Sequence, residues 1–169
     1  MPGTARVTIP RYLADVRRSP GQVLLLLMSL WFVSNGPAAF AMCPSFSFGP
    51  HMTSCTVMVF GFIPVTVNGW HALFHFVTGI AGVFLAHRPR AAFAYGIGCG
   101  WFYLLVAGLG LAGGDNVLHF MAVDTFGNWI HAAEGGLVIT AAALTARRAA
   151  GGITHDAITL APAAPDGSG

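Results

Sequence analysis

The side chains in this chain that could do chemistry are asparagines and histidines that recur at helical spacing in two apolar segments. Asn68, His71 and His75 lie in one segment, and Asn128 and His131 lie in another. Intervals of three and four residues place side chains on one face of a helix, so each set forms a polar stripe. Imidazole is a common ligand for transition metals and haem iron, and it exchanges protons near neutral pH. The two stripes are therefore the predicted place for metal binding, haem binding or proton transfer.

Glu134 is the one acidic residue well inside a predicted helix, one turn beyond His131. An unpaired carboxylate in a membrane interior costs several kcal/mol. Its side chain is therefore expected to point into the bundle and either to pair with His71 or His75 or to stay protonated.

Three interpretations of this polar cluster are open. The leading one is a hydrogen-bonded network without a cofactor that fixes the register of the helices. The alternative is a site for a transition metal or haem b, formed by His71 or His75 with His131 and assisted by Glu134. The third is proton or ion handling by His75 and Glu134. No catalytic residues are predicted, because the sequence contains no GxSxG, HExxH or phosphate-binding loop.

A short sequence repeat relates the two polar stripes. The pattern N-x-x-H with an intervening tryptophan occurs at Asn68 to His71 and at Asn128 to His131. The repeat predicts two parallel halves about an axis along the membrane normal, with Asn68 level with Asn128 and His71 level with His131. A third pair, Asn116 and His119, predicts a short interfacial helix before the last apolar segment.

The elements that would position these residues are transmembrane helices. Hydrophobic residues make up 55% of the chain and charged residues only 8%, a balance typical of membrane proteins. Four windows are long enough to cross about 30 Å of hydrocarbon, namely residues 21–41, 65–87, 91–112 and 128–146. The predicted fold is all-α, a four-helix transmembrane bundle of two parallel-repeat helical hairpins. The run Asn35-Gly36-Pro37 is expected to kink or end the first helix.

The first window has an alternative interpretation as a signal peptide that ends at Ala39-Phe40-Ala41. Three further apolar windows favour a retained first helix instead.

The arginines predict the orientation of the bundle. All eight basic residues of the 169-residue chain are arginines, and they form three clusters, before the first window, between the second and third, and after the fourth. Cytoplasmic loops retain such residues, so both termini are predicted inside. Residues 1–20 are then an irregular cytoplasmic arm, residues 21–148 the transmembrane domain and residues 149–169 a disordered cytoplasmic tail.

The predicted location is the inner, cell membrane, with the lipid bilayer as the main partner. Other membrane proteins or further copies of the chain are candidate partners through the GxxxG motif of Gly96 and Gly100. A nucleic-acid partner is excluded, because the arginines form no basic stripe.

Cys43 and Cys55 fall in the first predicted outer loop. An oxidising outer compartment favours a disulfide between them, which would stabilise the loop by about 3 kcal/mol. Two unpaired thiols, or a metal pair with His51, are the alternatives.

A longer pattern resembles a known family. Residues 59–65, followed by the stripe of Asn68, His71 and His75, are similar to the signature of a family of small four-helix membrane proteins of unknown function that is frequent in actinobacteria. The resemblance covers about residues 59 to 145 and implies a four-span membrane protein, without an activity, cofactor or catalytic residue. Together these observations predict a non-enzymatic accessory, structural or envelope stress-related membrane component, with a haem- or metal-binding protein in redox, proton or ion transport as the alternative.

The topology can be tested with single-site reporters. Because the arginine clusters orient the chain, we expect reporters at residues 50 and 120 to lie outside and reporters at residues 15, 89 and 150 to lie in the cytoplasm. Labelling with a membrane-impermeant reagent measures this directly. A cytoplasmic residue 50 would contradict the whole layout.

Overall fold

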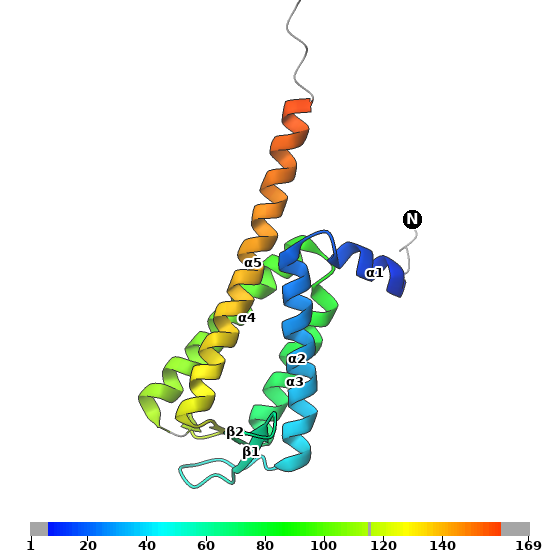
Figure 1. Cartoon of the computed structure of the whole chain (residues 1–169). Coiled ribbons are helices and arrows are strands. Elements are labelled where there is room, and N and C mark those ends of the chain that lie inside the picture. The colour runs from blue at the N-terminus through cyan, green and yellow to red at the C-terminus, as the bar shows by residue number, and fades with distance from the viewer. Residues whose placement is uncertain (1–6, 115, 160–169) are drawn as a thin grey trace, which may run out of the picture.

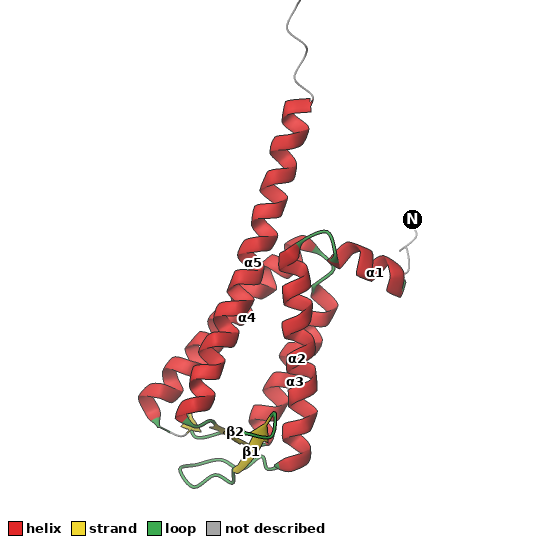
Figure 2. Ribbon diagram, viewed as in Figure 1, coloured by secondary structure: helices red, strands yellow, loops and turns green. Residues whose placement is uncertain are grey.

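The chain folds into two helical hairpins, each closed by a small sheet at the same end (Figures 1 and 2). The computed structural model describes residues 7–114 and 116–159. In chain order the elements are α1 (Ile9–Val16), α2 (Pro20–Met42), β1 (Cys55–Val59), β2 (Ile63–Val67), α3 (Gly69–Leu85), α4 (Pro89–Gly113), β3 (Asn116–Val117), β4 (Met121–Ala122) and α5 (Thr125–Thr159).

Helix α2 packs along α3, α4 packs along α5, and α2 also contacts α5, which joins the two hairpins. Strand β1 pairs antiparallel with β2, and β3 pairs antiparallel with β4. Each half therefore has the same order, a helix, a short β-hairpin and a second helix. The sheets lie at one end of the hairpins and α1 lies at the other (Figure 1).

The fold agrees with the predicted bundle in part. The described residues contain five helices and two small sheets, so the all-α, four-helix prediction is too simple. Three helices, α2, α4 and the part of α5 up to Ala150, are long and apolar enough to cross a membrane. Helix α3 is apolar but shorter, with 17 residues.

The second predicted window began too early, because residues 63–67 form strand β2 rather than the start of a helix. Ile63, Val65 and Val67 alternate with other residues, and β-branched residues at a period of two favour a strand. The pair Asn116 and His119 likewise lies in the β3–β4 hairpin and not in an interfacial helix, with Asn116 Oδ1 accepting from the backbone N–H of His119 at 3.3 Å.

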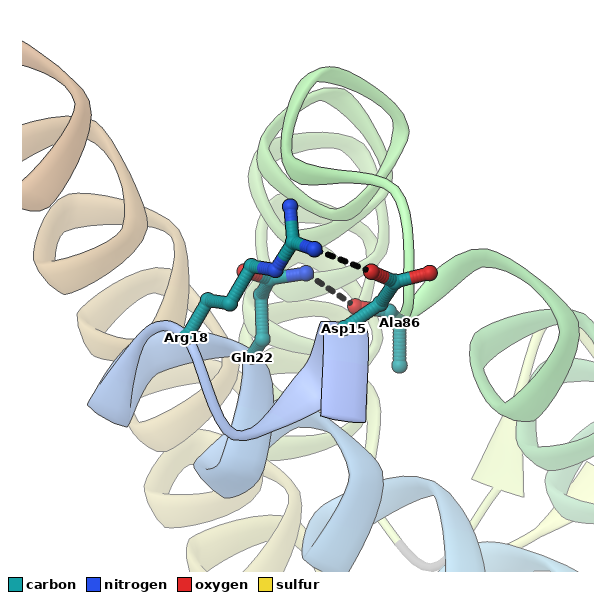
Figure 3. A network of polar contacts seen from close by, with 4 residues as sticks. All are labelled: Asp15, Arg18, Gln22 and Ala86. Carbon is teal, nitrogen blue, oxygen red and sulfur yellow. Dashed lines mark hydrogen bonds and ion pairs between the residues drawn. The ribbon is translucent and has the colours of Figure 1, made fainter. Parts of the chain in front are cut away.

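The N-terminal arm, predicted to be irregular over residues 1–20, contains helix α1. Pro10 lies in the first turn of α1 and Pro20 at the start of α2, where the missing N–H has no helical partner in any case. Gln22 Nε2 donates to the carbonyl of Ala86 at 2.8 Å, and Arg18 pairs with Asp15 at 3.1 Å (Figure 3). The Gln22 hydrogen bond fastens the start of α2 to the end of α3, whereas the Arg18–Asp15 pair lies within the N-terminal segment.

The predicted first window, residues 21–41, agrees with α2 within one residue at each end, whereas α5 is longer than predicted. Helix α2 does not end at the Asn35-Gly36-Pro37 run but continues to Met42, with Pro37 inside it. Helix α5 continues past Arg148 to Thr159, where a disordered tail was expected, and no proline interrupts it before Pro162. Residues 160–169 of that tail lie outside the described residues.

Glycines allow the helices of each hairpin to approach closely. A Cβ built at Gly100 would lie 2.8 Å from the carbonyl oxygen of Gly135, and one built at Gly135 would lie 2.7 Å from that of Gly100. Gly96 faces Val138 and Ala142 of α5 in the same way. The GxxxG motif of Gly96 and Gly100 thus packs within the chain.

Two alanine substitutions on α4 test this packing. Gly100→Ala should lower the stability of the protein by about 1–3 kcal/mol, because the new methyl group overlaps backbone atoms of α5. Gly98→Ala is the matched control, since nothing lies within 4 Å of a Cβ at Gly98. Thermal unfolding in detergent compares the two, and equal melting temperatures would contradict the proposed close approach.

Candidate functional site

Three histidine rings from α3 and α5 meet inside the protein. The Nε2 atoms of His71 and His131 lie 3.2 Å apart, and those of His75 and His131 lie 3.3 Å apart. His71 and His75 are each 6% exposed and His131 only 1%. One nitrogen atom from each ring lies within 4.8 Å of the others. We call these three residues the histidine cluster.

Side-chain caps at the helix starts position the cluster. Asn68 precedes α3, and its Oδ1 accepts from the backbone N–H of His71 at 3.1 Å while its Nδ2 donates to the carbonyl of Phe120 at 2.7 Å. Asp124 precedes α5 in the same way. Its Oδ1 accepts from Gly127 N–H at 2.6 Å and its Oδ2 accepts from Thr66 N–H at 2.5 Å. Each cap therefore also joins its helix to the neighbouring half.

These caps correct the register of the internal repeat. The sequence paired Asn68 with Asn128 and His71 with His131. In the structure Asp124 has the capping role of Asn68, so His131 is the counterpart of His75, one turn away from the predicted match. Because Asn and Asp cap helices equally well, aligning the two asparagines placed the repeat one helical turn out of register.

Asn128 does not join the histidine cluster. It lies inside α5, fully buried, against Gly110 of α4. Neither of its side-chain polar atoms has a hydrogen-bond partner among the described residues. The predicted network of Asn68, Asn128 and the histidines thus separates into a cap, a packing residue and a cluster.

The second ring nitrogens of the cluster have different surroundings. His71 Nδ1 lies 3.0 Å from the carbonyl oxygen of Ala122. A carbonyl only accepts, so the proton of neutral His71 lies on Nδ1 and the lone pair of Nε2 points toward His131. His75 Nδ1 lies 3.5 Å from the hydroxyl of Tyr103, which in turn lies 3.0 Å from Thr78 Oγ1. Hydrogen-bonded Nδ1 atoms are the usual support of Nε2 metal ligands.

Without an added cation the cluster is incompletely hydrogen-bonded. His131 Nε2 faces both other Nε2 atoms, but a single N–H there makes one well-directed hydrogen bond. His131 Nδ1 is buried and no described residue partners it. A positive ion at the meeting point would use all three Nε2 lone pairs.

Two of the three ring spacings match those around a bare metal ion, and the three ligand nitrogens lie within 4.8 Å of one another. Two imidazole nitrogens bound at 2.0–2.1 Å to a tetrahedral zinc ion are about 3.3–3.4 Å apart, close to the 3.2 and 3.3 Å found here. Haem fits less well. Iron between two axial imidazoles would hold their nitrogens about 4 Å apart with the porphyrin between them, and nitrogens 3.2 and 3.3 Å apart leave no room for that plane.

Glu134 lies beside the cluster but does not pair with a histidine as expected. Its Oε1 accepts from Trp31 Nε1–H of α2 at 2.8 Å, and its Oε2 has no partner within the described part of the chain. The side chain is 4% exposed. The contact of α2 with α5 brings the indole close, and a half-buried indole N–H needs an acceptor. Trp31 is thus a site residue that the sequence analysis missed, because nothing in the sequence shows which helices are neighbours.

The histidine cluster and Glu134 line a cavity of about 340 Å³. Its other walls come from α2, from the β1–β2 hairpin and from the start of α5. Phe60, at the tip of the hairpin, stacks on Trp31 with ring centroids 5.4 Å apart. The apolar wall residues include Ala38, Ala39, Met42, Val57, Val59, Val65, Val67 and Ile130.

Cys43 and Cys55 connect the end of α2 to the base of this hairpin. The structure joins their sulfur atoms, with the Cα atoms 5.8 Å apart. His51, the third member of the alternative metal pair, is exposed in the loop between them. The covalent bond in the cell remains a prediction.

One comparison with known proteins finds a match. The profile of the family described as Domain of unknown function (DUF4383) matches residues 22–144, which include most of both helical hairpins and every residue that lines the cavity. No curated protein and no solved structure matches the chain.

Thiol counting tests the disulfide. The chain has three cysteines, and Cys99 is buried and free. We expect the denatured protein to take up one alkyl group without reductant and three after reduction, because only Cys99 is then a thiol at the start. Intact mass analysis measures this. Three alkyl groups on the unreduced protein would rule the disulfide out.

Proposed function

The chain belongs to the DUF4383 family, and we propose that it is a multi-pass membrane protein that holds a transition-metal ion at His71, His75 and His131.

Four helices cross the membrane in this proposal, with both termini in the cytoplasm and the sheets outside. Helices α2, α4 and α5 meet the length requirement. Helix α3 has 17 residues and is therefore about 26 Å long, the lower limit for a span. Support for its spanning comes from a row of exposed apolar side chains, Leu73, Phe76, Val77, Ile80 and Phe84. The arginine clusters at the opposite end from the sheets support the orientation and the inner membrane as the location.

The convergence of three Nε2 atoms carries the metal proposal. Three neutral imidazoles are a donor set suited to zinc or copper. A three-histidine site leaves a further coordination position open, and here that position faces the cavity, because all three histidines line it. A metal-free network, the leading interpretation of the sequence, is less well supported, since a single N–H at His131 Nε2 can serve only one of the two Nε2 atoms that face it.

Metal analysis of two histidine variants tests the proposal. The detergent-purified protein, loaded with zinc or copper and freed of excess ion, should retain about one equivalent per chain. His131→Ala should lose that equivalent, since His131 contacts both other rings. His51→Ala is the matched control and should keep it, because His51 is exposed in the outer loop. Elemental mass spectrometry gives the ratio, and a wild-type protein that stays metal-free after loading would overturn the proposal.

A further inference from the structure

We propose that the cavity beside the histidine cluster binds a lipophilic alcohol, which enters from the bilayer between the end of α2 and the β1–β2 hairpin and donates its hydroxyl group to Glu134. This inference rests on the membrane placement proposed above and does not require the metal ion.

The cavity has one polar end and apolar walls. The histidine cluster and Glu134 lie at the buried end, and aliphatic side chains of α2, β1, β2 and α5 form the sides. Its volume of about 340 Å³ lies within the range of small-molecule sites, about 300–1,000 Å³. A ligand that complements these walls has an apolar body and one polar head.

The rim of the cavity is apolar and exposed. Met42 is 65% exposed, Met58 61% and Phe60 70%. These residues lie at the sheet end of α2 and on the β1–β2 hairpin, next to α2 in Figure 1. In a membrane-spanning protein such a rim faces the lipid or its interface rather than bulk water. Entry from the lipid phase therefore selects lipophilic molecules.

Glu134 determines the chemistry of the head group. Its Oε1 already accepts from Trp31, while Oε2 is buried in the cavity wall and lacks a donor from the described chain. A buried acceptor without a donor is costly, so a ligand that supplies one gains affinity. A hydroxyl group supplies that hydrogen from an uncharged ligand that partitions into lipid. An ammonium group is disfavoured because it would have to cross the apolar phase from which the ligand enters.

Glu134→Gln tests the head-group contact. The amide oxygen still accepts from Trp31, and the amide nitrogen then presents a donor to the cavity in place of the acceptor. We compare farnesol with farnesyl methyl ether, which has nearly the same apolar body but no hydroxyl hydrogen. The readout is competition of each compound against tritiated farnesol on the full-length protein in nanodiscs.

The ratio of the affinity for farnesol to the affinity for the ether should be about ten times larger in the wild type than in the Gln variant. This is the effect expected of one buried hydrogen bond to a carboxylate. The two compounds partition differently into lipid, but this difference is the same for both proteins. Comparing the affinity ratio of the wild type with that of the variant therefore removes it. An equal preference in both proteins would overturn the assignment of the hydroxyl to Glu134.

Two variants of α2 test the location without depending on Glu134. Ala38 is exposed and lines the cavity, whereas Ala41 is exposed on the same helix but does not line it. Ala38→Leu should weaken farnesol binding at least about tenfold by filling the entrance, and Ala41→Leu should leave it unchanged. Binding that survives Ala38→Leu unaltered would place the ligand elsewhere and contradict the proposal.

Failure of the ligand proposal and failure of the metal proposal can be distinguished experimentally. Farnesol binding is measured on protein stripped with a chelator and on metal-loaded protein. Retention of the hydroxyl preference in a protein that takes up no metal would contradict only the metal site. A protein that binds metal but shows no hydroxyl preference would contradict only the ligand site.

Discussion

His131 Nε2 lies 3.2 and 3.3 Å from two other ring nitrogens in a molecule whose helices are apolar on the outside. In such surroundings no water is present to form hydrogen bonds with a polar side chain, so its partners must come from the protein. This constraint explains why the histidines of α3 and α5 face one another across the two hairpins. It also explains why Trp31 and Glu134 pair across the contact of α2 with α5.

The two halves of the chain depend on each other for this arrangement. Asn68, at the start of α3, bonds to the carbonyl of Phe120 in the second half, and Asp124, at the start of α5, bonds to Thr66 in the first. The caps therefore determine where each helix begins and, at the same time, how the two hairpins are aligned. Glycine contacts such as that of Gly100 with Gly135 then hold α4 and α5 close together within their hairpin. The cavity remains where the β1–β2 hairpin, rather than a helix, covers the space between α2 and α5.

The sequence predicted those features that depend on composition or local spacing. Long apolar windows located α2, α4 and α5, and intervals of three and four residues showed that His71 and His75 share one face. Features that depend on tertiary neighbours could not be predicted. The partner of Glu134 proved to be Trp31 because α2 packs against α5, which no spacing within either helix reveals. The repeat was misaligned by one turn because a cap at Asp124 is recognised by its geometry and not by identity with Asn68.

The metal site is the central claim of this account, and X-ray absorption spectroscopy of the metal-loaded protein tests it most directly. We expect a first shell with three imidazole nitrogens at about 2.0–2.1 Å, as in other histidine-bound zinc sites. The same spectrum should be absent from His131→Ala prepared in parallel. A first shell that contains sulfur, or one made of water and carboxylate oxygen alone, would contradict binding at His71, His75 and His131.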